Sequence, residues 1–373
     1  MASKYKVYLD IGKDSNGKRI RKQFYGKTKK EAEEKRDLYL KQIDLDKRKY
    51  FAETFKIWLY EITKNRVKPS SFDKYEGIFR NFFEECPFYN APIGDIKPVD
   101  VQKYYNSLFN NGKSSNSIKN ANKLLKQFFN YCVDNDYIIK SPVNGKKVYI
   151  PIDEISKKEV EVFTDDEIKK MILQDEESFI KYAALISYAT GMRRGEILGL
   201  KESDIDYKNK QIYINRTVVT AYIVDSKGKR TKKTYISIPK TYNSIRTIPL
   251  PIGLIDVLKS VINLKNNMLL NGVNLKEEYK DMIFVSKQGN LIEASNFIRS
   301  WKNFLKRCNI EYKKFHSLRH TYATKQFQAG IPTLTISKLL GHSSIDITLD
   351  IYTHISDKDK NKSLDTLQAL WSY

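Results

Sequence analysis

Apolar residues are spaced differently in successive parts of this 373-residue chain, and these changes of period constrain the fold more than any single motif. Residues 5–12 alternate as a strand does, and residues 51–140 repeat at the i, i+4 spacing of helices. Residues 205–249 alternate again, and the rest of the chain after residue 163 has mainly helical spacing. We therefore expect a multidomain fold that is mainly α-helical and includes α+β parts.

Residues 1–50 are predicted to form a small domain of β-strands and one helix. Two alternating stretches, 5–12 and 20–24, flank residues 14–17, which carry the Asn-Gly signal of a hairpin turn. Thr28 is followed three residues later by Glu31, the spacing of a capping box, so a helix should begin there. The pattern fits a sheet of two or three strands packed on one helix.

Residues 51–150 are predicted to form a second, helical domain. Four stretches have apolar residues at helical spacing, and prolines mark their junctions; the stretches are 55–62, 72–83, 99–109 and 124–133. The aromatic residues along them favour a packed core over a surface on which bases would stack. Residues 137–162 break the helical pattern and are interpreted as a linker, which could be simply solvated or could follow a nucleic-acid backbone.

Residues 151–373 are predicted to form the third and largest domain. Thr164 and Glu167 have capping-box spacing, and the apolar stretch 180–190 reads as a buried helix that ends at Gly191. Residues 205–249 are interpreted as three antiparallel strands, with the polar stretch 225–233 as a long turn. Residues 356–371 are predicted to form a tail helix that docks either on its own domain or on a neighbouring copy.

The charge of the chain favours a polyanionic partner. It has 66 lysines and arginines against 44 acidic residues, a formal net charge of +22, and nucleic acid is the simplest partner for such a surface. Its three cysteines, which form no CxxC pair, argue against a zinc ribbon and suit a reducing compartment. The polar N-terminus does not resemble a signal peptide, and no run reaches the ~20 apolar residues of a membrane span. We expect a cytoplasmic protein without membrane contact.

All four histidines lie in the last 60 residues, beside Arg319 and Tyr352. Fixed guanidinium groups stabilise the negative charge that gathers on a phosphodiester in its transition state. An imidazole can move protons near neutral pH, and a tyrosine hydroxyl can attack phosphorus when it is suitably activated. These side chains are the inventory for phosphoryl transfer to a tyrosine hydroxyl.

Four segments resemble, in order and spacing, the active-site boxes of the tyrosine recombinases, or phage-type integrases, especially those of conjugative transposons. They are residues 190–196, 239–246, 315–324 and 339–354. The resemblance covers residues 160–360 strongly and the preceding region more loosely. It implies an arm-type DNA-binding domain at 1–50, a helical core-binding (SAM-like) domain at 51–150 and a mixed α/β catalytic domain with a tail helix at 151–373.

The resemblance also implies roles for single residues. Arg193 and Arg319 match the two phosphate-binding arginines of the family, and we prefer Arg193 to its neighbour Arg194. His342 matches the position that donates a hydrogen bond to the phosphate, and Tyr352 matches the nucleophile. The rival tyrosines, Tyr25, Tyr322 and Tyr373, do not follow a Gly-His pair by ten residues.

Three further residues complete the predicted site. Lys240 lies in a segment that resembles the mobile β-turn of the family and could protonate the departing 5′-oxygen, with Lys232 and Lys233 as competitors. His316 is three residues before Arg319, a spacing that puts both on one helix face, and it could shuttle protons. Glu196 should share a helix face with Arg193 and orient an arginine or a histidine.

His316 and His320 have the i, i+4 spacing of a zinc-binding helix, which makes a metal site an alternative. A metalloprotease helix needs glutamate directly after its first histidine, and this chain has Ser317 there. Glu196 has no second carboxylate beside it in the sequence, and no Gly-rich phosphate loop occurs. We predict no metal and no cofactor.

The sequence therefore predicts a site-specific DNA recombinase that cleaves and rejoins DNA through a 3′-phosphotyrosine intermediate and integrates and excises a mobile genetic element. Alternatives are a type IB topoisomerase-like enzyme, a resolvase-type tyrosine recombinase and a DNA-binding regulator with a degenerate site. The expected partners are double-stranded DNA at core and arm sites and three further copies of the chain in a homo-tetramer. An accessory excision or DNA-bending protein is a further candidate, and the expected location is the bacterial nucleoid.

Overall fold

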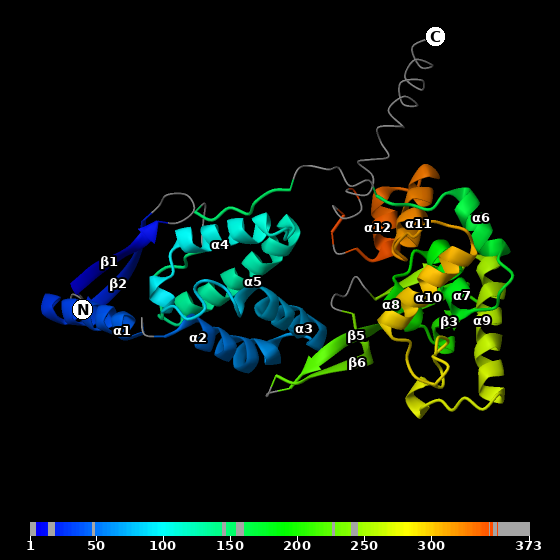
Figure 1. The fold of residues 1–373 in the computed structure, drawn as a ribbon, viewed down its shortest axis with the longest axis horizontal. Coiled ribbons are helices and arrows are strands. Elements are labelled where there is room, and N and C mark those ends of the chain that lie inside the picture. Colours follow the sequence, from blue (N-terminus) through cyan, green and yellow to red (C-terminus); the bar gives the residue numbers. More distant parts are fainter. Residues whose placement is uncertain are drawn as a thin grey trace, which may run out of the picture. The chain divides into compact units, whose positions relative to one another are not determined.

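The computed structural model describes residues 5–13, 19–46, 49–143, 147–153, 160–225, 228–239, 245–342, 344–345 and 349. Lys240, Tyr352, the predicted turn at 14–17 and the predicted tail helix at 356–371 lie outside these residues. The chain divides into two compact units: Met1–Lys157 with Tyr222–Thr231, and Lys158–Ala221 with Lys232–Tyr373 (Figure 1). None of the described helices is both long enough and apolar enough to cross a membrane.

The first unit begins with the predicted strand pair and helix. Strands β1 (Tyr5–Lys13) and β2 (Arg19–Gly26) are antiparallel, and α1 (Lys29–Asp46) follows. Thr28 caps α1, since its hydroxyl accepts the Glu31 N–H at 3.1 Å. The Glu31 carboxylate accepts from the Lys27 N–H at 2.6 Å, one residue earlier than in the capping box that the sequence predicted.

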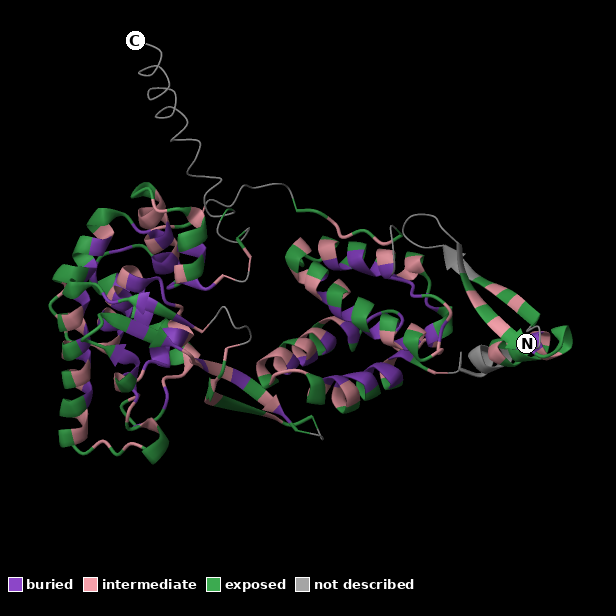
Figure 2. Ribbon diagram, turned by 180° about the vertical axis from the view of Figure 1, so that it is seen from behind, coloured by how far each residue is buried: buried purple, intermediate pink, exposed green. Residues whose placement is uncertain are grey.

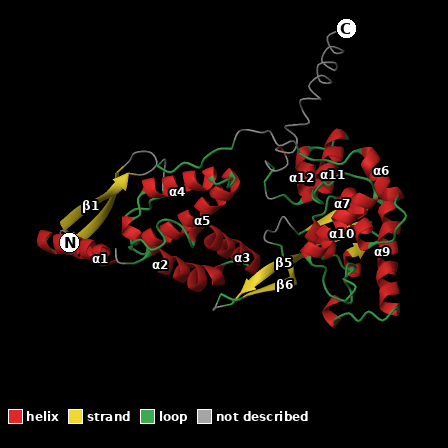
Figure 3. Ribbon diagram, in the orientation of Figure 1, coloured by secondary structure: helices red, strands yellow, loops and turns green. Residues whose placement is uncertain are grey.

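The remainder of this unit is helical, as expected, and Figure 3 shows its helices in red. Prolines stand at the first positions of α3 and α4, where a missing N–H costs nothing. The helices are α2 (Phe51–Ile57), α3 (Pro69–Ile78), α4 (Pro98–Asn110) and α5 (Ser115–Asp134), with π-helical turns η1 (Trp58–Thr63) and η3 (Phe79–Phe83) and 3-10 turns η2 (Lys64–Arg66) and η4 (Ile93–Asp95).

The aromatic residues of these helices form a core, which confirms the interpretation of their pattern. Phe51, Phe55 and Phe128 are fully buried, and the ring centroids of Phe55 and Phe128 lie 4.5 Å apart. Figure 2 shows the buried positions on the inner faces of the helices. Rings at such distances attract one another beyond the burial of their surface, so this set stabilises the helical unit.

Residues 222–231 also belong to this unit, and they include the end of β5 (Thr217–Val224) and the start of β6 (Arg230–Ser237), two strands that pair with each other. Val224 is buried in the aromatic core, and Arg230 donates to Asp73 and Glu76, at 2.7 Å in each case. The predicted turn at 225–233 is therefore wrong in its second half. Strand β6 begins at Arg230, because the ion pairs with α3 hold that residue.

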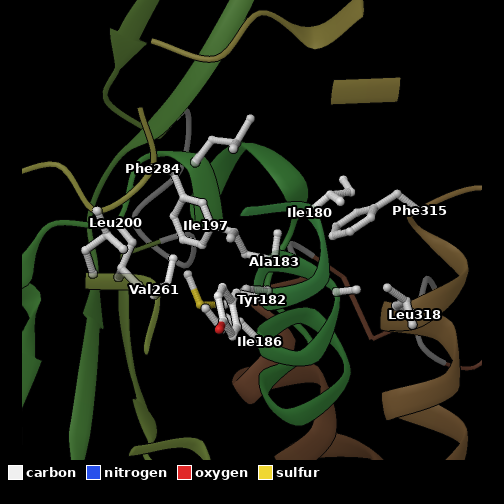
Figure 4. Close-up of a cluster of buried hydrophobic side chains, with 14 of the residues drawn as sticks. Ile180, Tyr182, Ala183, Ile186, Ile197, Leu200, Val261, Phe284, Phe315 and Leu318 are labelled. Atoms are coloured by element: carbon white, nitrogen blue, oxygen red, sulfur yellow. The ribbon is translucent and has the colours of Figure 1, made fainter. Parts of the chain in front are cut away.

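The second unit is built around α7 (Phe179–Thr190), whose residues are apolar on most sides and which packs on five other helices. Figure 4 shows Ile180, Ala183 and Ile186 of α7 in one cluster with Phe315 and Leu318. The other helices are α6 (Asp165–Leu173), α8 (Arg194–Leu198), α9 (Ile252–Leu270), α10 (Ala294–Arg307), α11 (Ser317–Gln328) and α12 (Thr333–Leu340), with 3-10 turns η5 (Glu202–Asp204) and η7 (Glu277–Tyr279).

The three strands predicted over residues 205–249 are five strands in two sheets, so the strand count was wrong. One sheet has the order β3-β4-β7, from β3 (Ile205–Asp206), β4 (Gln211–Ile214) and β7 (Arg246–Pro249), and the other is the β5–β6 hairpin. The break between β4 and β5 falls at Arg216, whose guanidinium bonds to Asp204 and to the Gly199 carbonyl. These long-range contacts end the first sheet, and the alternation alone did not reveal them.

Candidate active site

The site gathers around the C-terminal end of α12, in the second unit. Segments from three other places in the sequence reach this end: the turn from α7 into α8, the start of β7 and the first turn of α11. Gly191 ends α7 in the left-handed conformation, with φ of 66°, a conformation that glycine adopts without the cost of a β-carbon. The chain then extends through Arg193 into α8.

Arg193 and Glu196 are joined across the start of α8. Arg193 precedes the helix, and its N–H donates to Glu196 Oε2 at 2.9 Å while its guanidinium donates to Oε1 at 2.8 Å. The sequence prediction that both share a helix face was wrong, because Arg193 has an extended backbone (φ −70°, ψ 150°). The Arg193 side chain remains 36% exposed, so it can reach a ligand at the surface.

The neighbouring arginine has a different environment. The Arg194 guanidinium lies 5.9 Å from the centre of the Phe297 ring, in cation–π geometry, and burial lowers its pKa. The two consecutive arginines therefore make separate sets of contacts, and it is Arg193 that shares Glu196 with the rest of the site.

Arg319 is the most deeply buried of the predicted site residues that the structure describes, with 2% of its surface exposed. Its guanidinium donates to the carbonyl oxygens of Gly191 and Leu340, at 2.7 Å in each case. A buried guanidinium is costly unless its N–H groups have acceptors, and these two helix-terminal carbonyls supply them. Arg319 thereby joins the ends of α7 and α12.

Arg246 belongs to the same cluster, and the sequence analysis did not assign it to the site. It is 9% exposed, and its Nη1 and Nη2 donate to the two carboxylate oxygens of Glu196 at 3.1 and 3.0 Å. Its Nε donates to the Leu339 carbonyl at 2.6 Å. One signal could have indicated it: Arg246 has the same alternation phase as Ile248, a buried position of β7.

Three arginines thus meet at one helix end. Arg193, Arg246 and Arg319 donate to the carbonyl oxygens of residues 339–341, at distances from 2.6 to 3.4 Å. The last carbonyls of a helix have no intrahelical partner and carry a partial negative charge, so they suit guanidinium groups. This arrangement fixes the backbone from which His342 emerges.

Glu196 is the carboxylate among these arginines, and it is 6% exposed. Burial alone would raise its pKa, but the hydrogen bonds and charge of Arg246, with the charge of Arg193, lower the pKa to about 2. Glu196 is therefore ionised at neutral pH. Three guanidiniums and one carboxylate give this set of four described residues a net positive charge, which favours an anionic ligand.

The histidines of the site are neutral at neutral pH. Desolvation by the surrounding protein atoms, followed by the positive charges of nearby groups, lowers the pKa of His316 to about 4 and that of His342 to about 3, although His316 also has an exposed side. Arg319 and Arg193 contribute to both shifts, so both rings lie near the arginine cluster. Each ring can therefore accept a proton when a phosphate enters and offsets the positive charge.

His316 and His320 pack ring against ring, with centroids 4.8 Å apart and planes at 89°. His316 stands just before α11 and His320 lies in its first turn, and burial lowers the pKa of His320 too. The buried Nδ1 of His320 has no hydrogen-bond partner among the residues that the structure describes.

The structure therefore brings together five of the predicted site residues: Arg193, Glu196, His316, Arg319 and His342. Their catalytic roles remain predictions. Lys240 and Tyr352 lie outside the described residues, so their positions and roles remain predictions as well.

Comparison with known proteins decides the family. A family model described as "Phage integrase family" matches residues 161–359, and another, "Phage integrase, N-terminal SAM-like domain", matches residues 50–109. A curated protein of Caldanaerobacter subterraneus subsp. tengcongensis, "Tyrosine recombinase XerC-like", is 44% identical over 98% of this chain and 96% of its own length. The chain belongs to the phage integrase family. It is therefore a tyrosine recombinase, an enzyme of site-specific DNA recombination.

Solved structures share its fold. The Tn1549 transposon integrase bound to transposon right end DNA matches with a TM-score of 0.68 and 22% identity, over 84% of this chain and 99% of that one. A lambda integrase tetramer bound to a Holliday junction matches with a TM-score of 0.56 and 16% identity, over 90% and 89%. These matches confirm the predicted fold class, a mainly helical multidomain chain with small sheets.

Proposed function

We propose that this recombinase breaks and rejoins DNA through a 3′-phosphotyrosine intermediate and, by doing so, integrates and excises a mobile genetic element. The observation that supports this most is the meeting of Arg193, Arg246 and Arg319, from three distant segments, at the end of α12. A net positive cluster beside two neutral imidazoles suits a phosphodiester, whose negative charge grows in the transition state.

Arg193 and Arg319 would stabilise the negative charge on the non-bridging oxygens of the scissile phosphate. Arg193 is part-exposed and can donate to an oxygen directly, and Arg319 adds its fixed charge from below the surface. One preorganised donor of this kind is typically worth about 3 kcal/mol of transition-state stabilisation. His342 would donate a hydrogen bond to the same phosphate, and His316 would move a proton.

Tyr352 is the proposed nucleophile, a role that rests on the resemblance to the family. Its hydroxyl oxygen forms a bond to phosphorus as the bond from phosphorus to the 5′-oxygen breaks. The tyrosine proton passes to a base, for which His316 is the candidate, and Lys240 gives a proton to the departing 5′-oxygen. The phosphotyrosine keeps the bond energy, so the reverse reaction with a new 5′-hydroxyl rejoins DNA without ATP.

DNA is the partner that the family implies, and the relatives with solved structures include integrases bound to DNA. On the DNA, residues 51–150 and 151–373 would bind core sites, and residues 1–50 would bind separate arm sites. Strand exchange through a four-way junction needs four active sites, so we propose a homo-tetramer on DNA. An accessory excision or DNA-bending protein would set direction, and the reaction would take place at the bacterial nucleoid.

Two alternatives are not favoured. A type IB topoisomerase-like enzyme would share the nucleophile, but the integrase family model matches more than half of this chain. A resolvase-type recombinase would not need β1, β2 and α1 in front of the helical domain. The presence of these two strands and this helix supports an integrase that mobilises a genetic element.

A suicide-substrate experiment tests the proposal. Duplexes that carry a nick and are tiled across the DNA flanking the gene for this chain should trap a covalent protein–DNA adduct at a specific site. Tyr352→Phe should bind the same duplex and form no adduct, and the wild-type adduct should still form in EDTA. Adducts in the Tyr352→Phe variant would place the nucleophile elsewhere, and a wild-type chain that forms none on any duplex would contradict the function.

A further inference from the structure

Arg246 has no role in the proposed cleavage chemistry, although it is buried in the middle of the site. It opens β7 and pairs with Ile214 of β4, so its side chain lies on the buried face of the sheet together with Ile248. A β-branched apolar residue at this position would suit a buried strand better than an arginine does. The presence of a charge here needs a reason other than packing.

The contacts of its guanidinium supply that reason. Two nitrogens hold both oxygens of Glu196, and the third holds the carbonyl of Leu339. Glu196 in turn holds the backbone and the guanidinium of Arg193. The planar guanidinium group of Arg246 therefore connects Glu196, which holds Arg193, to the end of α12, which precedes His342.

A gain in stability is not enough to explain a charged group at this position. Arg246 adds a third buried or half-buried cation to a cluster with one described carboxylate. Buried ion pairs are frequently no more stable than apolar residues of similar size, because both charges lose their hydration. An apolar residue could not reproduce the fixed directions in which the planar guanidinium group donates its hydrogen bonds.

We propose that Arg246 is a positioning residue for DNA cleavage. By holding Glu196 and the end of α12 in one plane, it aligns Arg193 and His342 on the same phosphate. It does not itself contact the DNA. This inference rests on the proposed function, because it assigns to Arg246 a part in the same cleavage step.

Arg246→Lys tests this role, because lysine keeps the positive charge but has a single nitrogen that cannot reach three acceptors in fixed directions. We expect binding of the trapped duplex to change less than about threefold, and the single-turnover rate of adduct formation at saturating DNA to fall about 100-fold, the loss that a small misplacement of catalytic groups causes. Arg246→Gln, which keeps a planar neutral end, should be slower still.

Arg216→Lys is the matched control. Arg216 is a part-buried arginine that, like Arg246, bonds to a carboxylate and to a backbone carbonyl in the same unit; its partners are Asp204 and Gly199. It lies outside the site, so its replacement should lower the melting temperature as Arg246→Lys does and leave the rate of adduct formation within about threefold of wild type.

A third comparison separates positioning from general damage. Because Arg246 acts partly through Glu196, adding Arg246→Lys to a Glu196→Gln chain should slow cleavage by a smaller factor than Arg246→Lys does in the wild-type chain, whereas independent effects would multiply. Multiplying effects, or equal rates for Arg246→Lys and Arg216→Lys, would overturn the proposal. Loss of folded protein in both Arg246 variants would overturn it too, since Arg246 would then be needed for folding. A wild-type chain without adducts would instead contradict the proposed function.

Discussion

Replacing Glu196 by glutamine tests the electrostatic description of the site most directly. Glutamine has the shape of a protonated glutamate, so the variant removes one negative charge and little else. Arg246 would keep a neutral oxygen acceptor but lose the charge of Glu196, and it is only 7% exposed in its side chain. We expect the chain to lose stability at neutral pH and to keep its fold.

The size of the loss follows from the pKa of the carboxyl group. Its ordinary value is 4.5 and the folded chain lowers it to about 2, a difference worth about 3 kcal/mol. A lowered carboxyl pKa stabilises the fold above the unfolded value of 4.5, and this stabilisation disappears as the pH falls toward 2. Since Glu196 is 6% exposed, solvent screening reduces this figure little.

Urea unfolding of the full chain can measure it. Trp301 is 1% exposed in the second unit, and replacing Trp58 and Trp371 by phenylalanine in every variant leaves it as the only tryptophan. The chain with Glu196→Gln should have an unfolding free energy about 3 kcal/mol below that of the chain with Glu196 intact, at pH 7 and at pH 5. Below pH 4.5 this difference should shrink by roughly 1.4 kcal/mol per pH unit.

Glu176→Gln is the control for this measurement. Glu176 also bonds to an arginine, Arg307, but that side chain is 46% exposed, so its ion pair should contribute less than about 1 kcal/mol. A Glu196→Gln loss no larger than that of the control, or a loss that stays constant from pH 7 to about pH 3.5, would refute the description of Glu196 as a buried carboxylate held ionised by arginines.

Two further predictions concern the same unit. Gly195→Ala should lower the free energy of unfolding by about 1–3 kcal/mol, because the added β-carbon would lie 2.8 Å from the Val218 carbonyl oxygen. Gly253→Ala is the control: its β-carbon would have no atom within 4 Å, so the free energy of unfolding should rise by about 0.5–1 kcal/mol. Equal effects of the two substitutions in urea unfolding would contradict this prediction. In an NMR titration of the free chain, the rings of His316 and His342 should stay neutral down to about pH 5, and a ring that titrates near its ordinary value of 6.5 would be inconsistent with the site.

Local signals predicted much of the fold because they act within a few residues. Thr164 and Glu167 form the expected capping box, with hydrogen bonds of 3.2 and 2.8 Å, and Gly191 ends α7 where the apolar pattern stops. Pro69 and Pro98 open helices, as their positions indicated. In each case the residues that decide the structure are neighbours in the sequence.

The sequence predictions were wrong where the local structure depends on residues that are distant in the sequence. Strand β6 begins at Arg230 because Asp73 and Glu76, more than 150 positions earlier, hold its guanidinium. The same limit applied to the site: motif spacing indicated Arg193 and Arg319, but the burial of Arg246 depends on Glu196, 50 residues before it. The alternation of a strand predicts which face of the sheet a side chain occupies. It does not predict which distant residue that side chain will contact.

The charges of the site suggest why its parts come from so many segments. A buried guanidinium is tolerated only if its N–H groups have acceptors, and Arg319 finds them in the carbonyls of Gly191 and Leu340, the ends of two helices. Those acceptors are dipoles without net charge, so they satisfy the hydrogen bonds and leave the cation unneutralised. Among the acceptors described for the three arginines, only Glu196 carries a negative charge. Because most of these acceptors are backbone carbonyls at helix ends and not carboxylates, the site keeps a net positive charge. A phosphate that binds there would meet guanidinium groups whose directions are already fixed.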